Sequence, residues 1–320
     1  LNGLISHLGR VSDRSAALRQ LLKRSSRLAD LFALVTEKVI ADKHYIRWLD
    51  RRVNSFSIYL SPISISEPLR QIFQDPEVNW IFTSATLSLD GDFGHMQATM
   101  GLESAKCSSF DSPFDYSQVV RAWLPDALPL PGSETHIRGL VEALLPLISC
   151  NPGRTLFLFT SYKAMRQAAS MISGLERPFL MQGAMSRAEL TRAFIERPGA
   201  VLLATQSFWE GVDFRGTDLR CLIIDKLPFP NPVDPVYAAQ AEQITNSGGD
   251  SFAEFALPKA ILALKQGFGR LIRQESDRGL FVLGDSRLRS REYGDFILSK
   301  LPEMIWLDSL DDASQWLRKL

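Results

Sequence analysis

Residues 155–205 read TLFLFTSYKAMRQAASMISGLERPFLMQGAMSRAELTRAFIERPGAVLLAT, and in them apolar runs alternate with helical patterns. The runs at 155–159 and 200–204 are almost continuously apolar, which is typical of strands buried on both faces. Residues 163–173 and 187–196 are predicted to be helices. Strands of this kind separated by helices predict an α/β fold, a doubly wound parallel sheet covered on both faces.

Three more segments extend the same pattern. Residues 178–181, 219–224 and 279–283 are predicted to be further strands of the sheet. Ligands of such sheets bind at the loops that leave the carboxyl ends of the strands. Candidate functional residues are therefore those that follow each apolar run, namely Ser84 to Thr86, Thr160 to Tyr162, Gln182-Gly183, Thr205 to Asp213, Asp225-Lys226 and Asp285.

The first part of the chain has a different texture. Residues 1–52 carry leucines and valines at three- and four-residue steps without a proline, which predicts helices. Their many Arg and Lys residues indicate either a helical hairpin with a solvated face or a dedicated DNA-binding arm. Residues 56–60 alternate like a strand. Residues 80–83 are predicted to be a buried strand that delivers Ser84, Ala85 and Thr86 to a loop.

Composition sets broad limits. The 320 residues include 36 basic and 36 acidic side chains, and 45% of them are hydrophobic. This balance is ordinary for a globular protein, and it leaves nucleic-acid binding open because basic groups can gather locally. Three widely spaced cysteines and four scattered histidines predict neither disulfides nor a metal site. We expect a cytoplasmic protein without a membrane span, and because the chain begins at Leu1, part of a longer one.

The segment Gln266-Gly-Phe-Gly-Arg-Leu-Ile-Arg273 is the most informative. It lies on a helix predicted from Pro258 onward, where Gln266, Arg270 and Arg273 would share one face. Two arginines and a glutamine on one face are suited to phosphate oxygens. Gly267 and Gly269 weaken a helix, a cost that close approach to another surface would explain. The alternative is a basic surface helix with incidental glycines.

A second segment, Ala204 to Asp213, places two carboxylates around a glycine after a buried strand. Glu210 and Asp213 could accept ribose hydroxyls or hold a cation, and Thr205 and Ser207 could contact a phosphate. The alternative is a helix start in which Thr205 or Ser207 is the N-cap and Glu210 its capping-box partner. The hydroxyl residues at 84–86 and 160–161 could likewise be helix caps.

In their order and spacing these segments resemble the late motifs of XPD-like superfamily 2 DNA helicases, and most closely the bacterial DinG/YoaA branch. The resemblance covers nearly all of residues 54–301. It rests on the segments FTSATLS (82–88), DSPFDY (111–116), LFLFTSYKAMRQAA (156–169), ATQSFWEGVDFRG (204–216), LIIDKLPFPNPVDPVYAAQAE (222–242) and LPKAILALKQGFGRLIRQESDRG (257–279).

The resemblance implies a role for each segment. Gln266, Arg270 and Arg273 would face ATP bound to the other motor lobe, with the arginines stabilising charge on the γ-phosphate. Ser84, Ala85 and Thr86 would couple nucleotide state to lobe movement. The remaining sites would line the nucleotide cleft (Glu210, Gly211, Asp213 and Gly269) or contact the backbone of single-stranded DNA (Thr160, Ser161, Tyr162, Gln182, Thr205 and Ser207).

The resemblance also implies a domain organisation. Residues 1–52 would be a helical remnant of the family's Arch insertion, and residues 53–116 the end of the first motor lobe. Residues 117–301 would form a RecA-like second helicase lobe, followed by a tail helix in 302–320. The sequence contains no GxxxxGK[ST] loop and no DEAH-like motif, so ATP and Mg²⁺ would need the missing half, where the family's 4Fe-4S cluster is also expected.

Two hypotheses follow. In the first, the intact protein is an ATP-dependent DNA helicase, moving 5′ to 3′ on single-stranded or forked DNA in repair or replication, and this piece is inactive alone. In the second, the chain is a non-catalytic module that binds DNA and recruits a partner. The tail carries Trp306 and Trp316, which could either cap the second lobe or dock a replication or repair protein, for example a clamp-loader accessory subunit.

Overall fold

The computed structural model divides into two compact units. The first comprises residues 1–79, 97–103 and 231–251, and the second comprises 80–96, 104–230 and 252–320. The described residues are 1–36, 44–75, 77–208 and 218–320. Among them, no helix is both long and apolar enough to cross a membrane.

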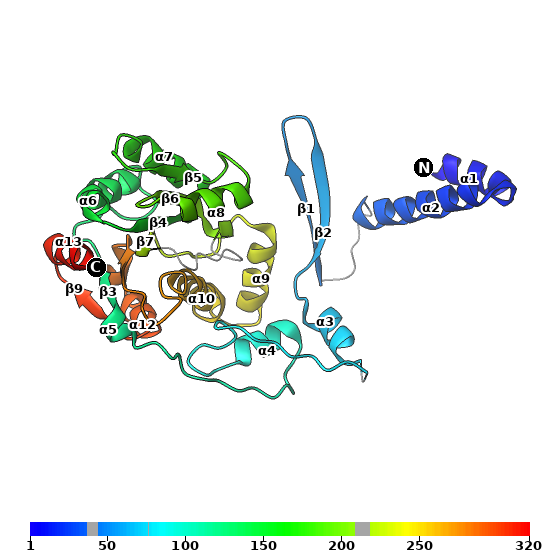
Figure 1. Ribbon diagram of the computed structural model, residues 1–320. Coiled ribbons are helices and arrows are strands. Elements are labelled where there is room, and N and C mark those ends of the chain that lie inside the picture. Colours follow the sequence, from blue (N-terminus) through cyan, green and yellow to red (C-terminus); the bar gives the residue numbers. More distant parts are fainter. Residues whose placement is uncertain (37–43, 76, 209–217) are drawn as a thin grey trace. The chain divides into compact units, whose positions relative to one another are not determined.

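The second unit is built on a seven-stranded sheet in which every pairing is parallel. Its strands lie in the order β5-β6-β4-β7-β8-β3-β9, so strands adjacent in the chain are often separated in the sheet (Figure 1). This confirms the predicted α/β fold. The strands are β3 (Val120–Trp123), β4 (Arg154–Phe159), β5 (Phe179–Met181), β6 (Val201–Thr205), β7 (Leu219–Ile224), β8 (Gly279–Leu283) and β9 (Ile305–Leu307).

Alternate residues of the central strands supply two separate cores, one on each face of the sheet. Leu156 and Leu158 of β4 belong to one core, and Phe157 and Phe159 to the other. All four side chains are at most 1% exposed. Burying each contributes roughly 1.5–3 kcal/mol, which explains why residues 156–159 are all apolar. The first core is covered by α8, α10 and α12, and the second by α6, α7 and α13.

The helices of this unit include the two predicted beside β4 and β6. Their bounds are α5 (Tyr116–Val119), α6 (His136–Cys150), α7 (Tyr162–Ile172), α8 (Arg187–Glu196), α10 (Leu257–Phe268), α11 (Arg287–Ser290), α12 (Tyr293–Ser299) and α13 (Leu310–Lys319). A π-helical turn, η3 (Phe252–Ala256), leads into α10, and a short 3-10 helix, η2 (Gln206–Phe208), follows β6.

Side-chain caps fix where several of these helices begin. Ser161 accepts a hydrogen bond from the backbone N–H of Ala164 at the start of α7. Ser186 and Glu189 form a reciprocal capping box at the start of α8. Such caps satisfy backbone donors that have no partner inside the helix, and each is worth about 1 kcal/mol.

The tail helix predicted from Asp308 is present as α13. It is capped by Ser309 and has acidic residues in its first turn and basic residues in its last, as its dipole favours. Trp316 donates from Nε1 to the carbonyl of Gly279 at 3.2 Å, and the guanidinium of Arg121 lies 4.3 Å from the centre of its ring. In this structure the tail therefore packs as part of the second unit.

The first unit holds the helices α1 (Asn2–Val11), α2 (Ala16–Thr36), α3 (Ser66–Phe73) and α9 (Pro235–Asn246), while α4 (Gly94–Met100) spans the boundary between the units. Helices were predicted throughout residues 1–52, and this is wrong for its end. Residues Tyr45–Arg51 form β1, which pairs antiparallel with β2 (Phe56–Pro62). Trp48 stacks on Tyr59 with ring centroids 4.1 Å apart, a cross-strand contact that the sequence of β1 alone does not reveal.

The buried strand predicted at residues 80–83 is also wrong. These residues form no helix or strand, and Ile81 is 86% exposed. An apolar run becomes a strand only where another strand pairs with its backbone, and no strand among the described residues does so. Ser84 to Thr86 consequently do not follow a strand of the sheet.

Candidate functional site

Polar side chains gather along one edge of the sheet, at the carboxyl ends of five neighbouring strands. Thr160 follows β4, Gln182 follows β5, and Thr205 ends β6. Asp225 follows β7, and Asp285 lies just beyond β8. Because these strands are adjacent and parallel, the structure confirms that these five predicted positions share this edge, whereas Ser84 to Thr86 do not follow a strand of the sheet.

Three of the predicted DNA-contacting residues are joined by hydrogen bonds. The amide oxygen of Gln182 accepts from the backbone N–H of Thr205 at 2.7 Å and from its hydroxyl at 3.0 Å. The Gln182 amide nitrogen donates to the hydroxyl of Tyr162 at 2.8 Å. Tyr162 is 49% exposed, whereas Thr205 is 5% exposed. Of the three, Tyr162 is therefore placed to meet a ligand directly, and Thr205 to hold Gln182.

A buried carboxylate, Asp225, fixes the loop after β4. Its oxygens accept from the backbone N–H of Thr160 at 3.0 Å, from the Thr160 hydroxyl at 3.3 Å and from the N–H of Lys226 at 2.8 Å. Burial raises the pKa of Asp225 to about 7, although Lys226 and these hydrogen bonds act in the opposite direction. Thr160 is thus engaged by the protein itself.

Asp285, a candidate because it follows an apolar run, and His136, which was not predicted as a site residue, also lie at this edge. Asp285 is buried and accepts from the N–H of Leu227, and it forms an ion pair with Arg287 at 2.7 Å. His136, treated in the sequence as an ordinary histidine, lies buried with its ring nitrogens 3.0 and 3.2 Å from the carbonyls of Pro129 and Asp225. The sequence does not predict these contacts, because each joins residues that only the fold brings together.

Of the helix-cap roles weighed for the hydroxyl residues, the structure bears out that of Ser161 and not that of Ser84, which no helix follows directly. Ser161 is the N-cap of α7, as its position before the helix predicted. Ser84 accepts from the backbone N–H of Thr86 and closes a short turn. Ser207 lies in η2, after β6. Glu210, Gly211 and Asp213 lie outside the described residues.

Gln266, Arg270 and Arg273 were predicted to share one face of a helix, and the structure corrects this. The helix α10 ends at Phe268, so Gln266 is helical while Arg270 and Arg273 lie in the turns that follow. Gly269 is the C-cap, and the N–H of Arg270 bonds three residues back to the carbonyl of Gly267. The two glycines favour this ending. Both arginines are half-buried.

The buried residues Leu271 and Ile272 anchor these turns. Leu271 is 1% exposed and Ile272 is 4% exposed, so the backbone between the two arginines is tied to the core of the second unit. The Gln266 amide nitrogen lies 3.5 Å from the hydroxyl of Thr86, at the outer limit of a hydrogen bond. The predicted coupling segment therefore reaches the same region as the predicted phosphate-facing residues.

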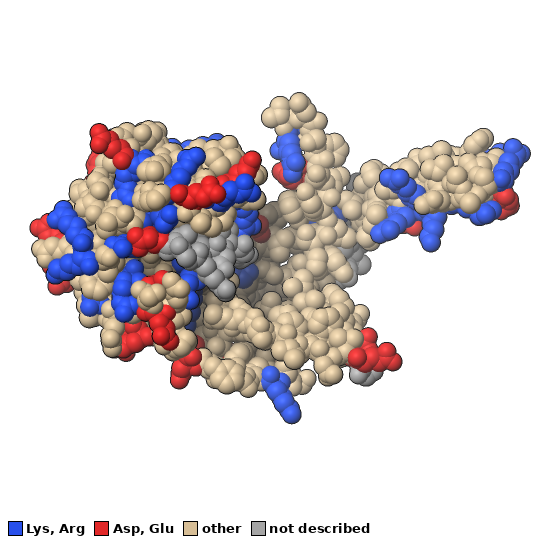
Figure 2. Space-filling view, in the orientation of Figure 1, with Lys and Arg blue, Asp and Glu red and all other residues tan. Residues whose placement is uncertain are grey.

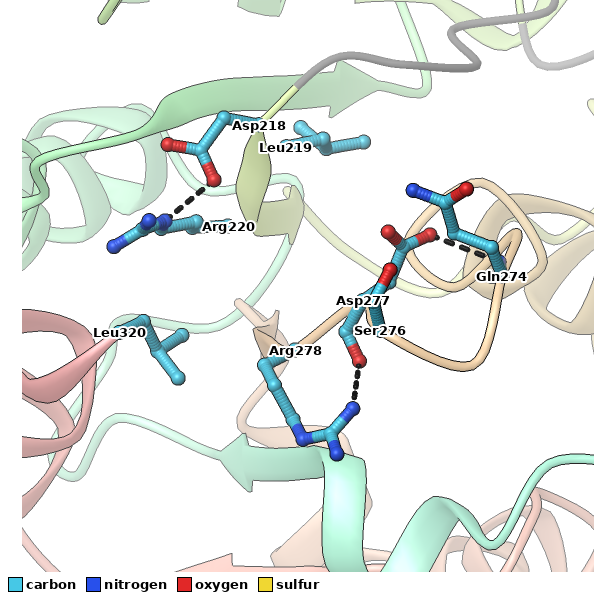
Figure 3. Close-up of a pocket in the computed structure, with 8 residues that line it drawn as sticks. All are labelled: Asp218, Leu219, Arg220, Gln274, Ser276, Asp277, Arg278 and Leu320. Atoms are coloured by element: carbon cyan, nitrogen blue, oxygen red, sulfur yellow. Dashed lines mark hydrogen bonds and ion pairs between the residues drawn. The ribbon is translucent and has the colours of Figure 1, made fainter.

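A pocket of about 310 Å³ lies at the opposite, amino-terminal end of β7 and β8 (Figure 3). Arg220 is paired with Asp218 at 2.6 Å, and Arg278 donates to the carbonyls of Glu275 and Asp277. These bonds occupy its charged groups with local partners, and no predicted site residue lines it. The lining residues are Asp218, Leu219, Arg220, Gln274, Ser276, Asp277, Arg278 and Leu320.

Charge is unevenly distributed between the units. On the second unit, basic and acidic side chains are interspersed on the visible face (Figure 2). On the helical pair α1–α2, basic side chains predominate in the same view. The exposed basic residues there are Arg10, Arg14, Arg19, Lys23, Arg24 and Arg27. This matches the basic helical hairpin expected from the sequence.

The cysteines do not fit an iron–sulfur cluster. Cys107 is exposed, Cys150 is half-buried and Cys221 is buried. Burial raises the pKa of the Cys221 thiol, which disfavours the thiolate that metals bind. Within residues 1–36, 44–75, 77–208 and 218–320, no group of three potential metal-ligating side chains occurs.

The parallel sheet, its two helical layers and its polar carboxyl edge define the second unit as a RecA-like lobe. An XPD helicase structure matches 94% of this chain with a TM-score of 0.61 and 18% identity, over 56% of its own length. The family described as "Helicase C-terminal domain" matches residues 144–304.

Curated relatives extend the match over almost the whole chain. It is 39% identical to the ATP-dependent DNA helicase YoaA of Escherichia coli over 92% of its length, and 32% identical to the ATP-dependent helicase DinG of Mycobacterium tuberculosis over 96%. The chain therefore belongs to the helicase C-terminal domain family, and YoaA and DinG are its relatives over almost its whole length. It spans about half the length of these relatives, 46% and 47% respectively.

Proposed function

We propose that this chain is the C-terminal motor part of an ATP-dependent DNA helicase that moves 5′ to 3′ on single-stranded DNA. The observation that carries the proposal is the position of Gln266, Arg270 and Arg273 at and beyond the end of α10, beside Thr86. The names of the relatives YoaA and DinG support it. We place the intact protein in DNA repair or replication, in the cytoplasm and associated with the nucleoid.

The proposed division of labour follows the family. Residues 1–52 return from the Arch, residues 53–116 complete the first motor lobe, and residues 117–301 are the second lobe with its tail at 302–320. The exposed Ile81 supports the assignment of residues 80–83 to a sheet supplied by the first lobe. An apolar run with an unpaired backbone is stabilised when a neighbouring strand pairs with it and buries its side chains.

The nucleotide is ATP with Mg²⁺, whose phosphoanhydride bond supplies the free energy for movement. Arg270 and Arg273 offer planar donor groups suited to phosphate oxygens, and their half-burial in turns anchored by Leu271 limits their motion. Glu210, Gly211, Asp213 and Gly269 complete our proposed nucleotide side. The sequence has no phosphate-binding loop, so the protein's N-terminal lobe must supply it and the fragment is inactive alone.

The DNA side is the carboxyl edge around Tyr162. Its side chain and that of Ser161 are exposed there, while Gln182 is tied to Thr205. We propose that Thr160, Ser161, Tyr162, Gln182, Thr205 and Ser207 contact or support the phosphate backbone of single-stranded or forked DNA. Contacts of this kind hold a strand without reading its sequence, as a translocating motor requires.

The test is Arg270→Ala in the full-length protein. We expect DNA-stimulated ATP hydrolysis to fall by about 10³–10⁵-fold, in line with the loss of other arginine fingers. DNA binding without nucleotide should be unchanged. Arg318→Ala, at an exposed position in the last turn of α13, is the matched control and should retain full activity. Full hydrolysis in Arg270→Ala would contradict the proposal.

The rival hypothesis, a non-catalytic DNA-binding and docking module, predicts a different result. We would mix this chain with its separately produced N-terminal half and measure DNA-stimulated hydrolysis. Activity only in the mixture supports the motor, and its absence from two folded, associated halves supports the module. The 4Fe-4S cluster belongs in our proposal to the N-terminal half, and a clamp-loader accessory subunit remains a candidate partner for the tail.

A further inference from the structure

The turn that follows Thr86 is held against the helix that leads to the arginines. Leu89 packs against the core that α10 helps to form. Its N–H and carbonyl are both bonded to Asp92, at 3.0 Å each, which closes a tight turn around Asp90. Residues 84–96 and α10 belong to the same compact unit.

Asp90 lies at the tip of this turn and joins two helices. One carboxylate oxygen lies 2.5 Å from the ammonium of Lys300, just after α12, and the other lies 3.4 Å from that of Lys265 in α10. The hydrogen bond from Lys300 lowers the pKa of Asp90, as expected for a carboxylate that is charged in its contacts. The backbone of Asp90 has a φ of +54°, a conformation that few residues other than Gly, Asn and Asp adopt readily.

Lys265 immediately precedes Gln266, whose amide reaches Thr86. The turn is therefore attached to α10 at two consecutive positions, once by charge and once by the amide. A single exposed ion pair contributes little to stability. Here one carboxylate is shared by Lys265 in α10 and Lys300 just after α12, which also restricts the orientation of the turn. Two ion pairs thus connect Asp90 to α10 and to the residue that follows α12.

We propose that Asp90 is a positioning residue that fastens the Ser84–Thr86 segment to α10 and so keeps Thr86 in register with Gln266, Arg270 and Arg273. The inference deepens the proposed function and rests on it, because coupling between Thr86 and the arginines matters only if the chain is part of an ATP-driven motor. Removing the charge leaves the turn without its ion pairs to Lys265 and Lys300, while the contacts of Leu89 and Gln266 remain. Movement of the Thr86 segment then no longer follows that of the helix end.

The attachment is tested first by hydrogen exchange on this chain carrying Asp90→Asn, a substitution that tolerates the same backbone conformation. We expect amides of residues 86–93 to exchange about threefold to tenfold faster than in the wild type at low salt, and the difference to shrink at 1 M salt. Asp92→Asn is the control, because its amide oxygen can still accept from Gly94. Equal exchange in Asp90→Asn and wild type overturns the proposal.

The consequence is tested in the full-length protein by measuring ATP hydrolysed per base pair unwound. We expect Asp90→Asn to raise this ratio about threefold or more while the KM for ATP stays within about twofold, since no nucleotide contact is removed. The exchanged pair Asp90→Lys with Lys300→Asp should recover part of the loss caused by Asp90→Lys alone. An unchanged ratio, or no recovery in a folded double variant, overturns the coupling role.

These results separate the two proposals. A wild-type protein without DNA-stimulated hydrolysis would contradict the proposed function, while the exchange experiment would still decide whether Asp90 fastens the turn. Normal hydrolysis and unwinding in Asp90→Asn would contradict the positioning role alone.

Discussion

The carboxyl group of Asp225 is fully buried, and its pKa lies near 7 because desolvation disfavours its charged form. A carboxyl whose pKa is raised on folding stabilises the folded protein at acid pH. This stabilisation is complete below the unfolded value near 3.8 and is lost as the pH rises through about 7. Above neutral pH the protein therefore holds an unfavourable buried charge.

We predict that Asp225→Asn removes this pH dependence. Asparagine can accept the N–H groups of Thr160 and Lys226 through its oxygen and donate to the Thr160 hydroxyl. Relative to wild type, the variant should gain up to about 4 kcal/mol of unfolding free energy between pH 4 and pH 8.5. Urea unfolding at several pH values measures it, and a difference that does not change with pH would contradict the argument.

At this scale the sequence predicted that Thr160, Gln182, Thr205, Asp225 and Asp285 reach the edge, because each ends or follows an apolar run that forms a strand of the sheet, while the run at 80–83 forms none. It could not predict how those residues are used there. The hydroxyl of Thr205 is directed to Gln182, and the carbonyl of Asp225 faces His136, through contacts between loops distant in the chain. Only the folded structure reveals them.

Arg177 connects several elements of the second unit through one side chain. Its guanidinium donates to the carbonyls of Ile148, Asn151, Gly153 and Gly199, at the end of α6, in the following loop and before β6. Partial burial lowers its pKa, so these carbonyls also supply the polar surroundings that its charge requires. One side chain thus satisfies backbone acceptors of three segments.

We predict that Arg177→Met lowers the unfolding free energy by about 3 kcal/mol, since it leaves several carbonyls without their charged donor. Arg192→Met, at an exposed position of α8, is the matched control and should change stability by less than about 0.5 kcal/mol. Thermal unfolding of the two variants gives the comparison. Equal melting temperatures would show that water replaces the guanidinium at little cost.

Elements were predicted correctly where one strand or helix carries its own pattern, as in β4, α7 and α8. The errors occur where contact with another segment determines the secondary structure. Tyr45–Arg51 becomes a strand because β2 lies beside it, and residues 80–83 form none because no strand pairs with them. The helix α10 ends at Phe268, and Leu271 and Ile272 of the following turns are buried in the core. The spacing of residues in the sequence does not predict this packing.

Across the whole molecule, large exposed apolar side chains concentrate in residues 1–110. Examples are Phe32 at 58%, Phe56 at 66%, Ile81 at 86% and Phe110 at 90%. Exposed apolar surface on this scale marks contacts with other protein. In the function proposed above, the N-terminal half of the helicase covers this surface.

We predict that this chain self-associates when alone and that its N-terminal half suppresses the association. Ile81→Lys should weaken binding of the two halves by about tenfold, through loss of a buried apolar side chain and gain of a charge at the contact. Val233→Lys, at a position 78% exposed, is the control and should leave binding unchanged. Sedimentation of the mixed halves measures both variants, and equal affinities would place the contact elsewhere.

The position of β3 in the sheet has a consequence during synthesis. Its Ala122 lies between Phe281 of β8 and Trp306 of β9, both made much later by the ribosome. Until β8 and β9 emerge from the ribosome, β3 has neither neighbour and its backbone remains unpaired. Translation must therefore proceed past residue 307 before this half of the sheet can close, so β3 gains its neighbours only late in synthesis.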